Sequence, residues 1–111
     1  MEERRKLPRY VMGSSGELTA PGARAVNVSV IVLSPEGALI ECRNPPPVGQ
    51  TCTLKIVWEG SETEVTAEVR SWQKSGSAGL MFLGLSEESR RRLKEICAAL
   101  PLAGPNPPKG Q

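Results

Sequence analysis

Apolar residues recur with a period of two in several short segments of this 111-residue chain. The segment 24–33 carries valine at every second position from its third residue, namely at Val26, Val28, Val30 and Val32. This spacing predicts a strand with the four valines on one face. The turn-forming residues 34–37 follow, and a second apolar segment spans 38–43. Residues 24–43 are therefore expected to form a β-hairpin.

Further strands are expected at 12–20, 51–59, 64–70 and 80–83. The alternation in 64–70 predicts that Val65, Ala67 and Val69 face the core, together with Leu80 from the next strand, and that Glu64 and Glu68 are exposed. The segment 80–83 is apolar throughout, which is typical of a strand covered on both faces.

After residue 85, the spacing of the apolar residues changes from that of a strand to that of a helix. Ser86 is a suitable N-cap residue, and Glu87 and Glu88 suit the positive end of a helix dipole. Apolar residues at helical spacing follow, at Leu93, Ile96, Cys97 and Leu100. Pro101 is expected to end the helix, and the Pro/Gly-rich residues 101–111 are expected to be disordered. The predicted fold is mainly β, a small six-stranded antiparallel barrel whose open side is covered by a C-terminal helix.

The first ten residues are charged and contain no apolar segment of the kind found in secretory signals. We expect residues 1–10 to form a flexible basic arm, residues 11–100 to form the folded domain, and the protein to be cytoplasmic. The net charge of +2 is too small to indicate a nucleic-acid or membrane partner. Arg90, Arg91 and Arg92 are interpreted as the solvated side of the helix, and Trp72 is more readily interpreted as an edge-packing residue than as a base-stacking platform.

The composition also excludes several kinds of catalytic and metal site. The chain contains no histidine, and its cysteines, Cys42, Cys52 and Cys97, lack the spacing of a zinc site. We therefore expect no enzyme activity, no metal and no cofactor. Cys42 and Cys52 lie on either side of a proline-rich loop and can be interpreted as a redox pair, although buried free thiols are the simpler interpretation.

Three sequence segments together resemble the PilZ domain family, bacterial receptor modules for cyclic di-GMP. RRKLPR, residues 4–9, resembles the family's RxxxR motif. VLSPEGA, residues 32–38, resembles its DxSxxG motif, and SAGLMFLGLSEESRRRLKEI resembles its last strand and helix. The resemblance covers residues 3–100 and implies a receptor that folds its arm over the nucleotide and signals to a protein partner.

The resemblance implies that cyclic di-GMP is bound by Arg4, Arg5, Arg9, Ser34 and Gly37. Val32 departs from the family pattern, because it stands where the motif has an acidic or amide residue. No shift of register restores the motif, although Asn27-Val28-Ser29 matches its first half.

Simpler structural interpretations remain open for these residues. Ser34 can be a turn residue, Gly37 can occupy a turn position whose backbone requires a positive φ, and Val32 can belong to the core. The alternative function is a protein–protein adaptor of the same fold that no longer binds nucleotide.

Overall fold

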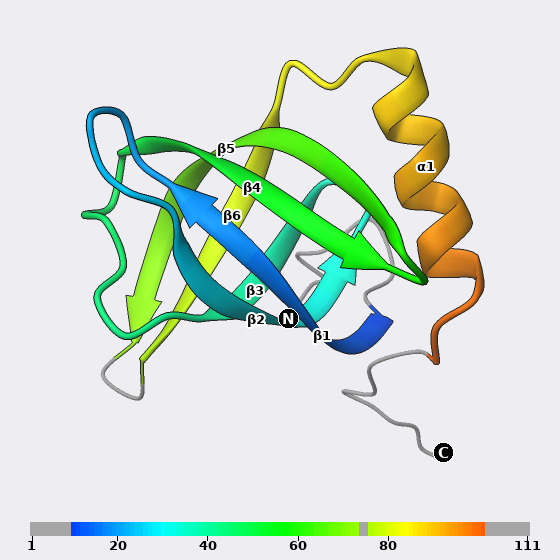
Figure 1. The fold of residues 1–111 in the computed structure, drawn as a ribbon, viewed down its shortest axis with the longest axis horizontal. Helices are drawn as coiled ribbons and strands as arrows, with labels where there is room; N and C mark the ends of the chain where they lie inside the picture. The colour runs from blue at the N-terminus through cyan, green and yellow to red at the C-terminus, as the bar shows by residue number, and fades with distance from the viewer. Residues whose placement is uncertain (1–9, 74–75, 102–111) are drawn as a thin grey trace, which may run out of the picture.

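The computed structural model describes residues 10–73 and 76–101, which form a closed barrel with one helix at its end (Figure 1). The elements in chain order are β1 (Tyr10–Thr19), β2 (Val26–Ser34), β3 (Gly37–Glu41), β4 (Thr51–Trp58), β5 (Ser61–Gln73), β6 (Ser77–Leu83) and α1 (Glu87–Ala98). The strands pair antiparallel in the order β1-β2-β3-β6-β5-β4, and β4 closes the barrel onto β1. The predicted six-stranded barrel with a C-terminal helix is therefore confirmed.

The predicted core face of β5 is confirmed, because Val65, Ala67, Val69 and, on β6, Leu80 are buried. Glu64 is exposed as predicted, but the prediction that Glu68 is exposed was wrong, since its side chain is half-buried. No helix occurs within the described part of residues 51–83. The hairpin β4–β5 is longer than expected, because β5 begins at Ser61 and continues to Gln73.

A β-bulge in β2 changes which of its residues face the core. The register of β2 against β3 shifts between Val30 and Val32. Val28 and Val30 are buried, but the next buried residue is Leu33, and Val32 is only half-buried. An extra residue in one strand moves the residues beyond it to the opposite face. The prediction that four valines share the core face was therefore wrong for Val32, and it was also wrong for Val26, which is 46% exposed.

The strand β6 is covered on one face only. Leu80 and Phe82 are buried, whereas Met81 between them is 36% exposed. Met81 Sδ lies 3.1 Å from a guanidinium nitrogen of Arg70 on the neighbouring strand. The expectation that residues 80–83 are buried on both faces was wrong, because the only helix in the described part lies at the end of the barrel and not over β6.

The helix α1 begins at the predicted cap. The Ser86 hydroxyl accepts a hydrogen bond from the Ser89 backbone N–H at 3.0 Å. Leu93, Ile96 and Cys97 are buried against the barrel. The helix contacts β2 and β5, which lie across the barrel from each other in the strand order. It therefore covers the end of the barrel, where the strands alone would leave the core open (Figure 1).

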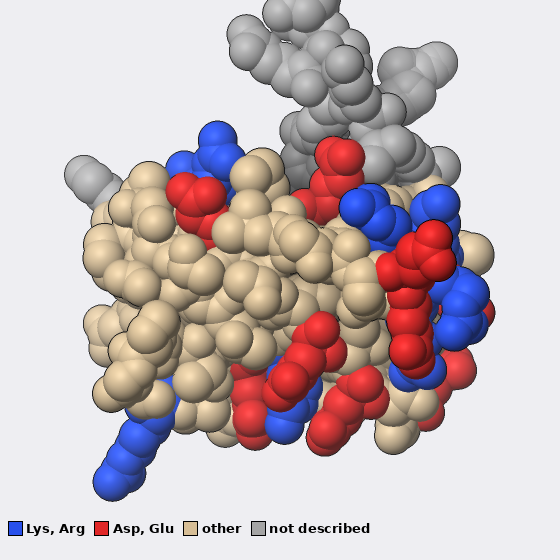
Figure 2. Space-filling view, turned by 90° about the horizontal axis from the view of Figure 1, so that it is seen from above, with Lys and Arg blue, Asp and Glu red and all other residues tan. Residues whose placement is uncertain are grey.

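The outer side of α1 carries mixed charge. Figure 2 shows acidic and basic side chains next to one another at the right of the view, where the helix lies. Arg91 donates to the Glu95 carboxylate at 3.2 Å, and both side chains are about 60% exposed. Arg90 is also exposed, while Arg92 is half-buried. This surface fits the solvated helix side that the sequence predicted for Arg90 and Arg91.

All three cysteines are buried free thiols. Burial raises the pKa of Cys97 to about 11 and also raises the pKa of Cys52, to which the nearby Cys42 adds a smaller effect. A raised pKa leaves less of the reactive thiolate at neutral pH. These properties favour the interpretation as structural thiols over the interpretation as a redox pair.

Two further features bear on partners. Trp72, near the end of β5, is 50% exposed. Within residues 10–73 and 76–101, no helix is both long enough and apolar enough to cross a membrane.

Candidate functional site

The hairpin between β2 and β3 carries Ser34 and Gly37. The Ser34 hydroxyl accepts hydrogen bonds from the backbone N–H groups of Glu36 at 3.2 Å and Gly37 at 3.1 Å. It donates to the Gly37 carbonyl oxygen at 3.3 Å. One donor and two acceptor positions are the full capacity of a hydroxyl. Ser34 therefore stabilises the turn, and a ligand can be bound by its hydroxyl only if one of these bonds is exchanged.

Gly37 is required by the close approach of β6. A β-carbon built at this position would collide with the Leu80 carbonyl oxygen. The Phe82 N–H donates to the Glu36 carbonyl oxygen at 2.8 Å, so the turn is also hydrogen-bonded to β6. Gly37 does not have a positive φ, and the suggestion that it meets such a need was wrong. Its missing side chain instead lets two backbones pack in direct contact.

We expect Gly37→Ala to lower the free energy of unfolding by about 1–3 kcal/mol, because the added methyl group must push β3 away from β6. Glu36→Ala is the matched control, since Glu36 is exposed and the change should stay within about 0.5 kcal/mol. Denaturant unfolding of both variants measures the difference. Equal stability of the two variants would contradict the close approach.

Val32 lies on the outer face of the barrel beside this hairpin. It pairs with Val11 on β1 and with Leu39 on β3. Val11 is 45% exposed, and Val32 and Leu39 are half-buried. We call these three residues the outer strip. The interpretation of Val32 as a core residue was wrong, and the surface next to Ser34 is apolar where the family motif would supply a hydrogen-bond acceptor.

The start of β1 lies next to the same hairpin. The prediction that Tyr10 belongs to the arm was wrong, because Tyr10 belongs to β1 and pairs with Leu33, the neighbour of Ser34. The site residues Arg4, Arg5 and Arg9 predicted from the sequence lie outside the described residues. In the sequence, Arg9 directly precedes Tyr10.

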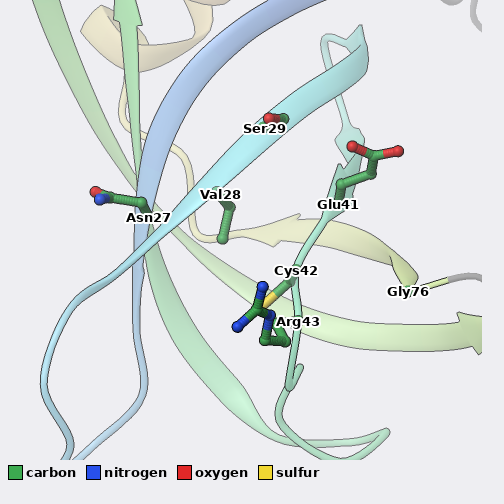
Figure 3. Close-up of a pocket in the computed structure, with 7 residues that line it drawn as sticks. All are labelled: Asn27, Val28, Ser29, Glu41, Cys42, Arg43 and Gly76. Atoms are coloured by element: carbon green, nitrogen blue, oxygen red, sulfur yellow. The ribbon is translucent and has the colours of Figure 1, made fainter.

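A second surface feature lies at the opposite end of β2. It is an open hollow of about 430 Å³, lined by Asn27, Val28, Ser29, Glu41, Cys42, Arg43 and Gly76. Figure 3 shows that Asn27 and Glu41 point away from each other, so their polar groups do not converge. Ser29 is five residues from Ser34 along the strand, or about 17 Å at the usual rise. Asn27-Val28-Ser29 therefore cannot replace the missing part of the motif at the hairpin.

The chain matches the PilZ domain over residues 3–99. Since this match covers most of its length, the chain belongs to the PilZ domain family, as the resemblance of its motifs predicted. Comparison with curated proteins found no match.

Solved structures with the same fold include several PilZ domains. One is the PilZ domain of CeSA from a cellulose-synthesizing bacterium, with a TM-score of 0.70 and 15% identity over 81% of this chain and 94% of that one. Another is the PilZ domain of YcgR from Escherichia coli, with a TM-score of 0.73 and 17% identity over 88% and 92%. The Bacillus subtilis inhibitor of motility MotI/DgrA has a TM-score of 0.71 and 17% identity over 87% of this chain but only 50% of its own. At these identities the likeness shows a shared fold.

Proposed function

We propose that this protein is a cyclic di-GMP receptor whose arginine-containing arm folds over the nucleotide at the β2–β3 hairpin. The observation that supports the proposal is the pairing of Tyr10, which directly follows the arginines in the sequence, with Leu33, the neighbour of Ser34. From this pairing we infer that the two motifs meet on one side of the barrel. The YcgR structure and the Klebsiella pneumonia MrkH structure are described as complexes with c-di-GMP, which supports the proposal.

The residues in this region suit parts of the ligand. Arg4, Arg5 and Arg9 can bind phosphate or the O6/N7 edge of guanine through the planar guanidinium, or stack on the purine face. The outer strip offers apolar contact to a base. Ser34 can redirect its hydroxyl hydrogen from the Gly37 carbonyl, its longest hydrogen bond, to the ligand. Ordering of the arm would then change the surface that a protein partner contacts.

The second candidate function is an adaptor of the same fold that binds a protein partner without nucleotide. Two observations favour it. Val32 presents no acceptor to guanine N–H groups, and the Ser34 hydroxyl is already fully used within the turn. In this case the hairpin motif persists because it stabilises the barrel.

Calorimetric titration of the 111-residue chain with cyclic di-GMP distinguishes the two functions. A receptor should show saturable binding, with cyclic di-AMP as the matched control because adenine lacks the O6 acceptor and N1–H donor of guanine. We expect a clear preference for the guanine nucleotide. If cyclic di-GMP at about 100 μM does not saturate the protein, its binding free energy is weaker than about 5.5 kcal/mol, and the adaptor function is favoured.

A further inference from the structure

A small cleft is lined by residues of the β4–β5 hairpin and of the C-terminal half of α1. It has a volume of about 280 Å³ and is lined by Trp58, Glu59, Ser61, Thr63, Arg92, Glu95, Ile96 and Ala99. Because α1 runs across the barrel end from β2 to β5, this cleft opens beside β5, across the barrel from β2. It is therefore distinct from the β2–β3 hairpin where the nucleotide is proposed to bind.

Thr63 is the unusual residue of this cleft. It lies on the core-facing side of β5 and is only 7% exposed, one of two buried polar residues in the described part of the chain. Its hydroxyl forms no hydrogen bond with any residue in that part. Buried polar groups are nearly always hydrogen-bonded, because an unmade bond carries the full penalty of lost hydration. Because Thr63 lines the cleft, its unpaired hydroxyl is a candidate binding group.

The other residues of the cleft define what it can bind. Trp58 and Ile96 provide an aromatic and an aliphatic surface next to Thr63. The Glu95 carboxylate is bound by Arg91, which leaves Glu59 and Arg92 as opposite charges without a salt bridge among the described residues. Their charges offset each other, so the cleft favours neither an anion nor a cation. The volume is too small for a dinucleotide and suits a single ring.

We propose that this cleft binds a neutral aromatic group that carries a hydroxyl, that is, a phenol. The ring packs between Trp58 and Ile96, and the phenolic O–H forms the hydrogen bond that Thr63 lacks. An aromatic ring supplies the apolar contact area, and its hydroxyl supplies the polar contact, as in a buried tyrosine side chain, whose O–H is usually hydrogen-bonded. This site goes beyond the proposed function and does not depend on nucleotide binding.

The test compares two probes, p-cresol and toluene, which differ by the hydroxyl alone. Each is titrated into the ¹⁵N-labelled full chain while the amide signals of Trp58, Thr63 and Ile96 are followed by NMR. We expect p-cresol to shift these signals and to bind about fivefold more tightly than toluene, the gain typical of one neutral hydrogen bond. N-acetyl-tyrosinamide, used as a third probe, shows whether the site also accepts the phenol of a peptide.

Two variants assign the preference to the Thr63 hydroxyl. Thr63→Val keeps the shape of the side chain without its hydroxyl and should reduce the ratio of the two affinities to about one. Thr63→Ser keeps the hydroxyl and should retain the preference. Thermal melting checks folding, and Thr63→Val should melt no lower than the parent protein, since it removes an unpaired buried group. The proposal is overturned if p-cresol leaves the three signals unchanged, or if its preference over toluene is absent in the parent or persists in Thr63→Val.

Discussion

Arg5→Ala and Arg9→Ala should each weaken cyclic di-GMP binding by about ten- to a hundredfold. Hydrogen bonds to charged groups are worth about 1.5–3 kcal/mol, and the guanidinium makes such bonds to phosphate or guanine. Arg9 directly precedes Tyr10, which pairs with Leu33 at the hairpin. Arg5 lies four residues earlier, within reach of the same ligand when the arm is extended. Calorimetric titration of each variant measures the loss.

Lys6→Ala is the matched control for these variants. Lys6 lies between the two arginines and its removal lowers the net charge by the same amount, but it is outside the RxxxR motif. If the arginines act through specific contacts, Lys6→Ala should change the affinity by less than about threefold, as expected for a screened charge. Equal losses in all three variants would show that the arm acts through net charge alone. Unchanged binding in both arginine variants would remove the arm from the site.

Val32→Asp should tighten cyclic di-GMP binding by about five- to a hundredfold while leaving the melting temperature nearly unchanged. A carboxylate at this position can accept guanine N–H groups that lose their water partners at the outer strip, a gain of about 1–3 kcal/mol. The change is tolerable because Val32 is half-buried on the outer face and not in the core, where an unpaired charge would destabilise the fold. Titration and thermal melting of the same variant measure both properties.

Thr66→Asp provides the control for the added charge. Thr66 is exposed on β5, which lies across the barrel from β2, and it belongs to neither motif. This variant should melt near the parent temperature and bind no more tightly. A Val32→Asp variant that melts many degrees lower and binds no nucleotide would show that this position cannot hold the acceptor, and the adaptor function would then be favoured.

Much of the fold could be predicted from the sequence because it depends on local patterns, such as the spacing of apolar residues along a strand or helix. The side-chain period of a strand is set by the backbone, so the alternation of Val65, Ala67 and Val69 identified a core face without knowledge of the partner strands. The helix N-terminus at Ser86 was also predictable, since capping uses a side chain and a backbone group only three residues apart. The site residues Arg4, Arg5 and Arg9 came from a motif and remain predictions.

Other features depend on contacts between segments that are far apart in the sequence, and only the tertiary structure determines them. The bulge in β2 arises where β2 and β3 pair, and it moved Val32 from the expected core to the outer face. Gly37 is required by the carbonyl group of Leu80, more than forty residues later in the chain. The cleft at Thr63 exists because α1 packs across the end of the barrel. A local pattern determines which way a side chain points along its own strand, but whether it then meets a core, a backbone or a cleft depends on which other strand or helix packs there.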